Sequence, residues 1–179
     1  MKVVLIGYRA CGKSTVGKML AEKLKIPFLD TDLLVEEELG MPIKDIVASH
    51  GWDFFRTREK EVVQKLTQKS ECVIATGGGV VLDGRNVDLL KKMGVVVWLA
   101  APLADIIERL KDDAQTDDLR PQFTNGNLVE ETTMVLKQRI AFYQKAADYV
   151  LDTAGKSALQ VMEEIYMHLL ESGIPGSGE

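Results

Sequence analysis

The sequence predicts an α/β domain in which a five-stranded parallel sheet is flanked by helices on both faces. Short apolar runs rich in β-branched residues alternate with longer segments of helical periodicity. The apolar runs lack the polar alternation of half-exposed strands, as is typical of strands covered on both faces. A chain of 179 residues with 46% hydrophobic residues also has the size of one domain with a buried core.

The expected elements of the first half follow from local signals. A run of β-branched residues indicates a strand, and apolar residues recurring every three or four positions indicate a helix. Gly40 is typical of a helix end and Pro42 of a helix start, so two short helices are expected around them. The expected order is strand 3–6, helix 13–24, strand 27–29, helix 33–39, helix 42–50, helix 52–68 and strand 72–75.

The second half continues the alternation but contains one long aperiodic segment. Residues 112–127 are rich in Asp, Asn, Gly and Pro, and a loop of that length in a compact domain is usually functional. The remaining elements are expected as strand 95–99, helix 102–111, helix 128–143, strand 149–151 and helix 157–170. We therefore expect a single domain over 1–171, followed by a disordered tail at 172–179.

Composition and charge argue against several classes of protein. A formal net charge of −5, from 22 Lys and Arg against 27 Asp and Glu, argues against a nucleic-acid-binding surface. Cys11 and Cys72 are isolated, which indicates a reducing compartment and neither a disulfide framework nor a zinc site. No apolar run reaches the roughly 18 residues of a membrane-spanning helix. We expect a cytoplasmic monomer that binds neither membrane nor nucleic acid.

The most specific motif lies between the first expected strand and helix. Residues 7–14 read Gly-Tyr-Arg-Ala-Cys-Gly-Lys-Ser and fit the pattern G-x-x-x-x-G-K-[ST]. Its glycines allow successive backbone N–H groups to converge on phosphate oxygens at a helix N-terminus. Lys13 can then reach the β- and γ-phosphates of a nucleotide, and Ser14 can bind Mg²⁺. The alternative is a glycine turn capped by Ser14, with Lys13 in solvent. Cys11 is expected to fill space in the loop, because no neighbouring residue looks like a base for a thiol nucleophile.

Two aspartates follow the second expected strand, at the edge where ligands bind in open α/β sheets. Asp30 is placed to approach the Mg²⁺ shell, and Asp32 is placed to accept a hydrogen bond from a substrate hydroxyl. One of them can equally serve as the N-cap of the next helix, and Asp32 precedes two leucines in that manner. The sequence leaves the two interpretations of Asp32 open.

Two arginines border apolar helix faces on separate helices. Arg56 lies at i,i+3 from Glu59, so the simplest interpretation is a local ion pair. Arg139 is surrounded at i±3 and i±4 by apolar and aromatic residues. Because a guanidinium group matches carboxylate geometry, the two arginines together can hold a substrate carboxylate.

Two further features suit a kinase. Gly77, Gly78 and Gly79 end the third strand without side chains that would obstruct a ligand, although a plain turn is the alternative. Arg120 is the one arginine of the aperiodic segment, which suits a lid that brings positive charge to a transferring phosphoryl group. A solvated loop arginine is the alternative interpretation.

In order and spacing, these motifs closely resemble those of shikimate kinases, P-loop kinases of the nucleoside-monophosphate-kinase structural family. The resemblance covers Met1 to about Leu170. It rests on G-Y-R-A-C-G-K-S, D-T-D at 30–32, F-F-R-x-x-E at 54–59, the glycine triplet, L-R-P at 119–121, Q-R-x-x-x-Y at 138–143 and L-D-T at 151–153. It implies ATP-dependent phosphorylation of the 3-hydroxyl of shikimate, in the route to chorismate and the aromatic amino acids, with Mg²⁺ as cofactor.

The resemblance also implies roles for individual residues. The acceptor-binding segment would be 31–60 and the lid 112–127. Catalysis would involve Lys13, Asp32 and Arg120. Shikimate would be bound by Asp32, Arg56, Glu59, Gly77, Gly78, Gly79 and Arg139. The nucleotide would be bound by Gly7, Ala10, Cys11, Gly12, Lys13, Ser14, Thr15, Arg109 and Arg120, with Arg109 on adenine and the segment after Asp152, near Ala158, opposite it. Mg²⁺ would be organised by Ser14 and Asp30.

Two other functions fit parts of the pattern. A kinase for another small hydroxy acid, such as gluconate, would also use an arginine pair for a carboxylate. A nucleotide-dependent switch would use the same phosphate loop, but it would have no use for inward-facing arginines. The N-K-x-D motif that selects guanine in many GTPases is also missing from the sequence.

Overall fold

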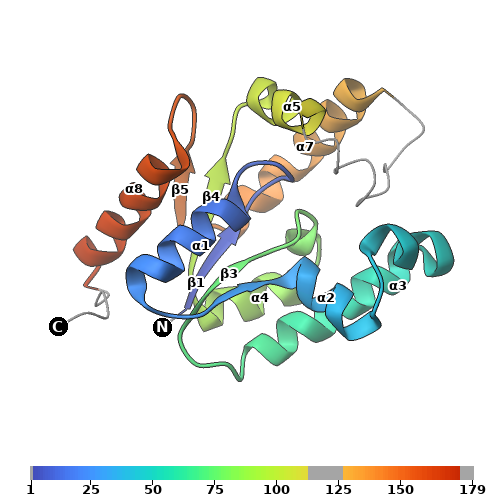
Figure 1. The fold of residues 1–179 in the computed structure, drawn as a ribbon, viewed down its shortest axis with the longest axis horizontal. Coiled ribbons are helices and arrows are strands. Elements are labelled where there is room, and N and C mark those ends of the chain that lie inside the picture. The colour runs from blue at the N-terminus through green and yellow to red at the C-terminus, as the bar shows by residue number, and fades with distance from the viewer. Residues whose placement is uncertain (1, 113–126, 174–179) are drawn as a thin grey trace.

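A computed structural model of the protein describes residues 2–112 and 127–173. Its sheet has five parallel strands in the order β2-β3-β1-β4-β5 (Figure 1). The strands are β1 (Lys2–Ile6), β2 (Phe28–Asp30), β3 (Cys72–Ala75), β4 (Gly94–Ala100) and β5 (Tyr149–Asp152). The predicted fold class is therefore confirmed, and each strand lies within two residues of its predicted position.

Strand β1 is the central strand of the sheet, between β3 and β4, and all of its residues are buried. Val3 pairs with Val73 of β3 on one side and with Val95 of β4 on the other. Since successive side chains of a strand point to opposite faces, Val3 and Leu5 join one core cluster while Val4 and Ile6 join the other. This explains the unbroken apolar run in the sequence.

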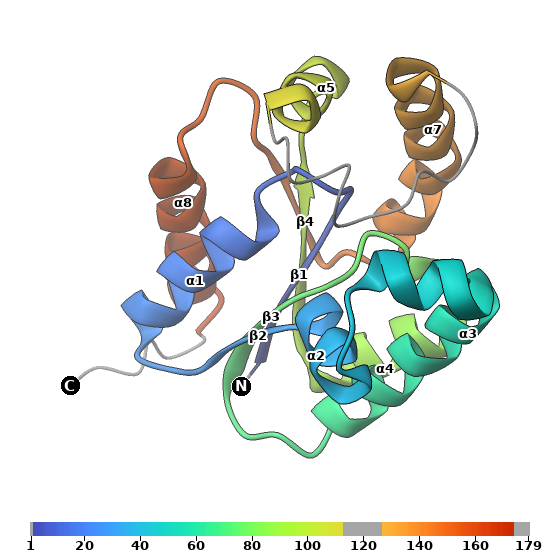
Figure 2. The same cartoon turned by 45° about the vertical axis from the view of Figure 1, so that its right-hand side comes forward.

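Helices cover both faces of the sheet. Figure 2 shows α1 and α8 on one side, with α2, α3, α4 and α7 on the other. Their bounds are α1 (Lys13–Leu24), α2 (Thr31–Leu39), α3 (Ile43–Leu66), α4 (Gly84–Met93), α5 (Leu103–Asp112), α7 (Leu128–Ala146) and α8 (Ala158–Glu171), with a short 3₁₀ turn at Val80–Leu82. The helices bury an apolar core on each face of the sheet, and these cores hold the strands whose ends carry the site.

Helix α3 joins two segments that the sequence predicts as separate helices. Gly51 has φ 81° and ψ 171°, which interrupts the helical backbone between them. A positive φ is accessible to glycine at little cost, so the chain can change direction here without strain. The aromatic residues and Arg56 that follow Gly51 are thus carried on a segment with its own direction.

Helix α4 was not predicted, which is the main error in the expected fold. Its apolar residues Val87, Leu90 and Met93 recur at helical spacing and pack against the core, but the helix has only 10 residues. A start signal was present, because the Asp83 side chain accepts a hydrogen bond from the N–H of Arg85 at 2.8 Å. At the other end of the chain, Ser172 caps α8 by bonding back to the carbonyl of His168.

Most of the expected lid and tail, residues 113–126 and 174–179, lies outside the described residues. Within the two described ranges, every helix is too short or too polar to cross a bilayer.

Candidate active site

The carboxyl ends of β1, β2 and β3 meet at one edge of the sheet and carry the predicted motifs. Because β3 lies between β2 and β1, the glycine triplet lies between the aspartates after β2 and the glycine-rich loop after β1. The predicted phosphate loop and acceptor residues are therefore brought to one edge, as ligand sites in open α/β sheets require.

The backbone of the glycine-rich loop depends on unusual φ values. Gly7 and Gly12 have φ of 143° and 94°, and a Cβ on Gly7 would lie 2.8 Å from the carbonyl oxygen of Leu99. Ala10 also has a positive φ, of 59°, which costs an alanine roughly 1 kcal/mol. Strain of this kind is typical of segments shaped to bind a ligand.

Lys13 is buried beneath this loop. Its ammonium group donates to the carbonyl oxygens of Gly7 at 3.0 Å and Tyr8 at 2.7 Å, and it lies 3.5 Å from Sγ of Cys11. Only 8% of Lys13 is exposed, so it is not the solvated lysine of the alternative interpretation. The lysine bridges the two carbonyl oxygens at the start of the loop. Its ammonium group therefore lies where it could also contact a phosphate bound in the loop.

Ser14 and Asp30 form a pair of oxygen ligands beside the loop. The Ser14 hydroxyl donates to Oδ2 of Asp30 at 2.7 Å, while Oδ1 of Asp30 accepts the N–H of Asp32 at 3.0 Å. Asp30 is thus the N-cap of α2, which answers the open question about Asp32. Asp32 is 7% exposed and does not cap the helix.

The pair fits Mg²⁺, which prefers oxygen ligands and usually keeps only one or two from protein. A hydroxyl and a carboxylate in hydrogen-bond contact can share one ion. The described residues contain no group of three or more His, Cys, Asp or Glu side chains that could hold a metal ion alone. An ion at Ser14 and Asp30 would therefore take its remaining ligands from phosphate and water.

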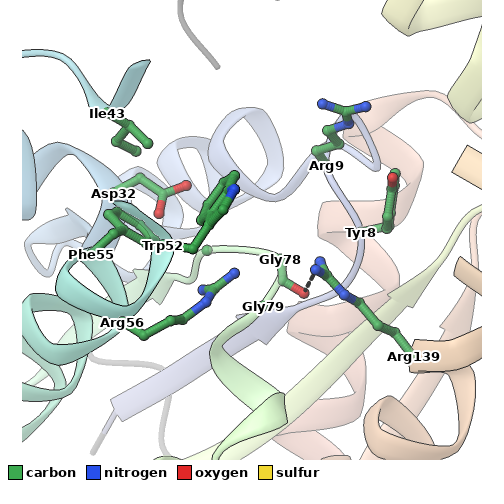
Figure 3. Close-up of a pocket in the computed structure, with 11 residues that line it drawn as sticks. Tyr8, Arg9, Asp32, Ile43, Trp52, Phe55, Arg56, Gly78, Gly79 and Arg139 are labelled. Atoms are coloured by element: carbon green, nitrogen blue, oxygen red, sulfur yellow. Dashed lines mark hydrogen bonds between the residues drawn. The ribbon is translucent and has the colours of Figure 1, made fainter. Parts of the chain in front are cut away.

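A pocket beside the loop contains three arginines, and we call it the three-arginine pocket (Figure 3). About 430 Å³ of space lies among its lining residues, part of it open to solvent. Its lining residues are Tyr8, Arg9, Asp32, Ile43, Trp52, Phe55, Arg56, Gly77, Gly78, Gly79 and Arg139. The predicted acceptor residues are therefore brought together, except Glu59, which lies behind the wall.

Glu59 holds Arg56 in this wall. One guanidinium nitrogen of Arg56 donates to both carboxylate oxygens of Glu59, at 2.9 and 2.8 Å. Glu59 is 1% exposed, and burial raises its pKa to about 7 although the positive charge of Arg56 acts in the opposite direction. Arg56 also lies over the rings of Trp52 and Phe55, 5.5 and 5.2 Å from their centroids. The predicted i,i+3 pair exists, and its arginine still lines the pocket.

Arg139 reaches the pocket from α7. It donates to the carbonyl oxygen of Gly78 at 3.1 Å, and the hydroxyl of Tyr143 donates to the same oxygen at 2.6 Å. Burial raises the pKa of Tyr143, so this hydroxyl stays protonated and remains a donor. The glycine triplet is therefore a fixed floor of the pocket and not an unsupported turn.

Sequence reasoning did not identify Arg9, Tyr8 or Trp52 as pocket residues. Arg9 occupies an unspecified position of the loop motif, yet its side chain is 8% exposed and pairs with Glu131 of α7 at 3.2 Å. Glu131 carried a usable signal, because it lies eight residues before Arg139 on an amphipathic helix whose buried positions recur every four residues. The sequence around Tyr8 and Trp52 contains no signal that distinguishes a residue of a pocket wall from a residue of the core.

A second groove lies on the other side of the loop, and we call it the Arg109 groove. Arg109 borders it and donates to the carbonyl oxygen of Ala10 at 3.2 Å. Its remaining lining residues are Ala10, Cys11, Gly12, Thr15, Val16, Thr153, Lys156, Ser157, Ala158 and Val161. Several residues predicted to bind nucleotide thus share one groove, whose far wall follows Asp152. Arg120 lies outside the described residues.

Comparisons with known proteins agree with this geometry. The family model for shikimate kinase matches residues 9–170. The shikimate kinase of Syntrophus aciditrophicus is 42% identical over 171 residues, covering 91% of this chain and 88% of that protein. The shikimate kinase of Moorella thermoacetica is 44% identical over 163 residues, covering 91% of each.

A solved structure extends the likeness to three dimensions. Shikimate kinase from Acinetobacter baumannii in complex with shikimate has a TM-score of 0.90 and 33% identity, covering 97% of this chain and 95% of that chain. Sequence, fold and the placement of the motif residues all lead to the same assignment. The chain belongs to the shikimate kinase family.

Proposed function

We infer that this protein transfers the γ-phosphoryl group of ATP to the 3-hydroxyl of shikimate, giving shikimate 3-phosphate for the synthesis of chorismate and the aromatic amino acids. The observation that carries the inference is the position of the three-arginine pocket directly beside the phosphate loop. Family membership supports it, and so does the shikimate bound to the Acinetobacter baumannii enzyme.

Arg56 and Arg139 would hold the acceptor carboxylate. They reach the pocket from different helices, and each is already directed by a short contact, with Glu59 or with the Gly78 carbonyl. Preorganised guanidinium groups lose little side-chain freedom when the carboxylate binds. Asp32, on the same pocket wall, would accept the hydrogen bond of the reacting hydroxyl.

The phosphates of ATP would bind in the loop over residues 7–14, and the adenine would occupy the Arg109 groove. Lys13 would exchange its bonds to the Gly7 and Tyr8 carbonyls for phosphate oxygens, which are stronger partners for an ammonium group. Ser14 and Asp30 would hold Mg²⁺, which neutralises phosphate charge when bound. Arg120, in the proposed lid 112–127, would add a further positive charge to the phosphates.

The reaction forms a bond between the acceptor oxygen and the γ-phosphorus and breaks the bond from that phosphorus to the departing ADP oxygen. Asp32 would orient the hydroxyl, and the proton of that hydroxyl would pass either to Asp32 as general base or to the transferred phosphoryl group. Most of the acceleration would come from positioning and from neutralising charge on the phosphoryl oxygens. The acceptor-binding segment 31–60 would supply the positioning for shikimate.

A coupled assay of ADP release, run with shikimate, gluconate, AMP and no acceptor, tests this function. Stimulation by shikimate alone supports it. Stimulation by gluconate or AMP would assign a different kinase activity, and hydrolysis without acceptor would favour a nucleotide switch.

We also propose that the protein is a cytoplasmic monomer. Cys11 and Cys72 are free and buried, which suits a reducing compartment. Light scattering of the purified protein would measure its mass directly, and a particle of twice 19.8 kDa would contradict the monomer.

A further inference from the structure

The Arg9–Glu131 ion pair links the phosphate loop to α7 within the wall of the three-arginine pocket. Nη2 of Arg9 lies 3.2 Å from Oε1 of Glu131, and the two side chains are 8% and 1% exposed. Removing two charges from water costs several kcal/mol per ion, and apolar residues of similar volume often stabilise a fold as well or better. Arg9 lines the pocket and Glu131 lies behind it, so the pair can serve ligand binding as well as stability.

Helix α7 carries Glu131, the partner of Arg9, and Arg139 on one face. Glu131, Val135, Arg139 and Tyr143 are buried at intervals of four residues, which places them along one side of the helix. The Tyr8 ring lies between the two arginines, 5.8 Å from the guanidinium of Arg9 and 6.0 Å from that of Arg139. The helix that positions Arg139 therefore also determines where Arg9 is held.

Charge compensation distinguishes Arg9 from a residue of the phosphate cradle. A buried glutamate lies against its guanidinium, so Arg9 offers directed N–H donors with much of its net charge cancelled. Arg56 is compensated by Glu59 in the same way, so the position of Arg9 in the pocket, and not its charge, separates it from the pair that would hold the carboxylate. Figure 3 shows Arg9 on the loop side of the pocket, apart from the guanidinium groups of Arg56 and Arg139.

We propose that Arg9 contacts the acceptor by donating to hydroxyl groups that are not phosphorylated, and that Glu131 is the positioning residue that directs it. This inference rests on the proposed function, since it assigns a further contact to the same polyhydroxylated acceptor. It makes one position of the phosphate loop a determinant of acceptor specificity.

The test compares Arg9→Met, Arg9→Lys, Glu131→Gln and Glu131→Asp with wild type. Measurements are KM and kcat for shikimate, for an analogue lacking one non-reacting hydroxyl and for MgATP, together with the melting temperature. Glu130 is exposed and adjacent to Glu131, so Glu130→Gln is the matched control and should behave as wild type.

We expect Arg9→Met and Glu131→Gln each to raise the KM for shikimate about tenfold, the value of one charge-assisted hydrogen bond, and to change the KM for the analogue much less. The KM for MgATP should stay within about twofold. Arg9→Lys and Glu131→Asp should recover part of the loss. The double variant should be no worse than either single variant, because both changes remove one contact.

Three results would overturn the proposal. A higher KM for MgATP with unchanged shikimate kinetics would assign Arg9 to the phosphate cradle. A lower melting temperature with unchanged kinetics would show that the pair has only a structural role. Equal rises in the KM for shikimate and for the analogue would show that Arg9 does not contact that hydroxyl. If Arg9→Met does not fold, Glu131→Gln carries the test from outside the loop. A wild-type protein inactive on shikimate would instead contradict the proposed function.

Discussion

The guanidinium group of Arg56 lies against Gly79, in the space that a side chain at position 79 would occupy. Gly79 has φ −104° and ψ 0°, so its backbone does not require glycine. Position 79 therefore lacks a side chain because of the arginine and not because of the turn. The identity of this residue controls where Arg56 can lie.

Gly79→Ala should impair shikimate binding while leaving the fold intact. The three atoms nearest to the added methyl group all belong to the flexible end of Arg56, so the arginine can move away at little cost to stability. We expect the KM for shikimate to rise by tenfold or more, with the melting temperature nearly unchanged. Gly84→Ala is the control, because a Cβ there meets nothing within 4 Å. An unchanged KM in Gly79→Ala would show that Arg56 does not bind the acceptor.

Arg56→Ala and Arg139→Ala should each weaken acceptor binding by about 1.5–3 kcal/mol, the value of a charge-assisted hydrogen bond to the carboxylate. Steady-state kinetics with varied shikimate should show the loss mainly in KM. Arg58→Ala is the control on the same helix as Arg56, because Arg58 is 37% exposed and pairs with Glu61 outside the pocket. Normal shikimate kinetics in both pocket variants would contradict the carboxylate clamp.

Glu59 should make stability depend on pH between about 4.5 and 7. Burial raises its pKa from 4.5 to about 7, so in this interval the folded protein keeps a proton that the unfolded chain releases. Its contribution is therefore fully present below about pH 4.5 and is lost as the pH rises to about 7, a change on the order of 3 kcal/mol.

Urea unfolding of wild type and Glu59→Gln across this pH range measures that contribution. The free energy of unfolding of wild type, minus that of the variant, should fall as the pH rises and become level above about 7. A difference that does not change with pH would show that Glu59 titrates normally in the folded protein.

Removing Mg²⁺ should abolish turnover, and Ser14→Ala should raise the Mg²⁺ concentration needed for half-maximal rate. The Ser14 hydroxyl and the Asp30 carboxylate are 2.7 Å apart, so loss of one oxygen leaves the other as a weaker site. Titration of MgCl₂ at saturating substrates measures the effect. Thr133 is exposed near the start of α7 and bonds only within its own helix, so Thr133→Ala should leave the Mg²⁺ dependence unchanged.

Lys13→Ala should lower turnover severely and should also lower the melting temperature modestly. The ammonium group satisfies the carbonyl oxygens of Gly7 and Tyr8, and its removal leaves buried acceptors without that donor. Lys18→Ala, on the exposed side of α1, is the control. Full turnover in Lys13→Ala would contradict a phosphate contact, and an unchanged melting temperature would contradict its structural role.

The strands and the phosphate loop were predictable because their signals are local. The apolar run before Gly7 and the helical spacing after Lys13 lie within a few residues of the motif that they frame. Helix α4 was missed although Val87, Leu90 and Met93 recur at helical spacing, because a helix of 10 residues repeats that pattern only briefly. The break at Gly51 was predicted as a boundary, but its left-handed backbone was not.

The ion pairs of the site were predictable only where one helix carries both partners. Arg56 and Glu59 are three residues apart, so their contact follows from helix geometry. Arg9 and Glu131 are 122 positions apart, and nothing local to either residue indicates the other. The sequence left open whether Asp32 caps α2, and the hydrogen bond from the N–H of Asp32 to the Asp30 carboxylate shows that Asp30 is the cap.

The adjacency of β1 and β3 sets how far a donor phosphate in the loop would lie from the glycine floor beneath the acceptor. Neighbouring strands lie about 4.8 Å apart whatever side chains they carry, because backbone hydrogen bonds fix the interval. The spacing between the two reactants is thus built into the main chain, whereas the choice of acceptor depends on side chains of the phosphate loop, α2, α3 and α7. A lineage could exchange those side chains for a new acceptor and keep the reacting atoms in line.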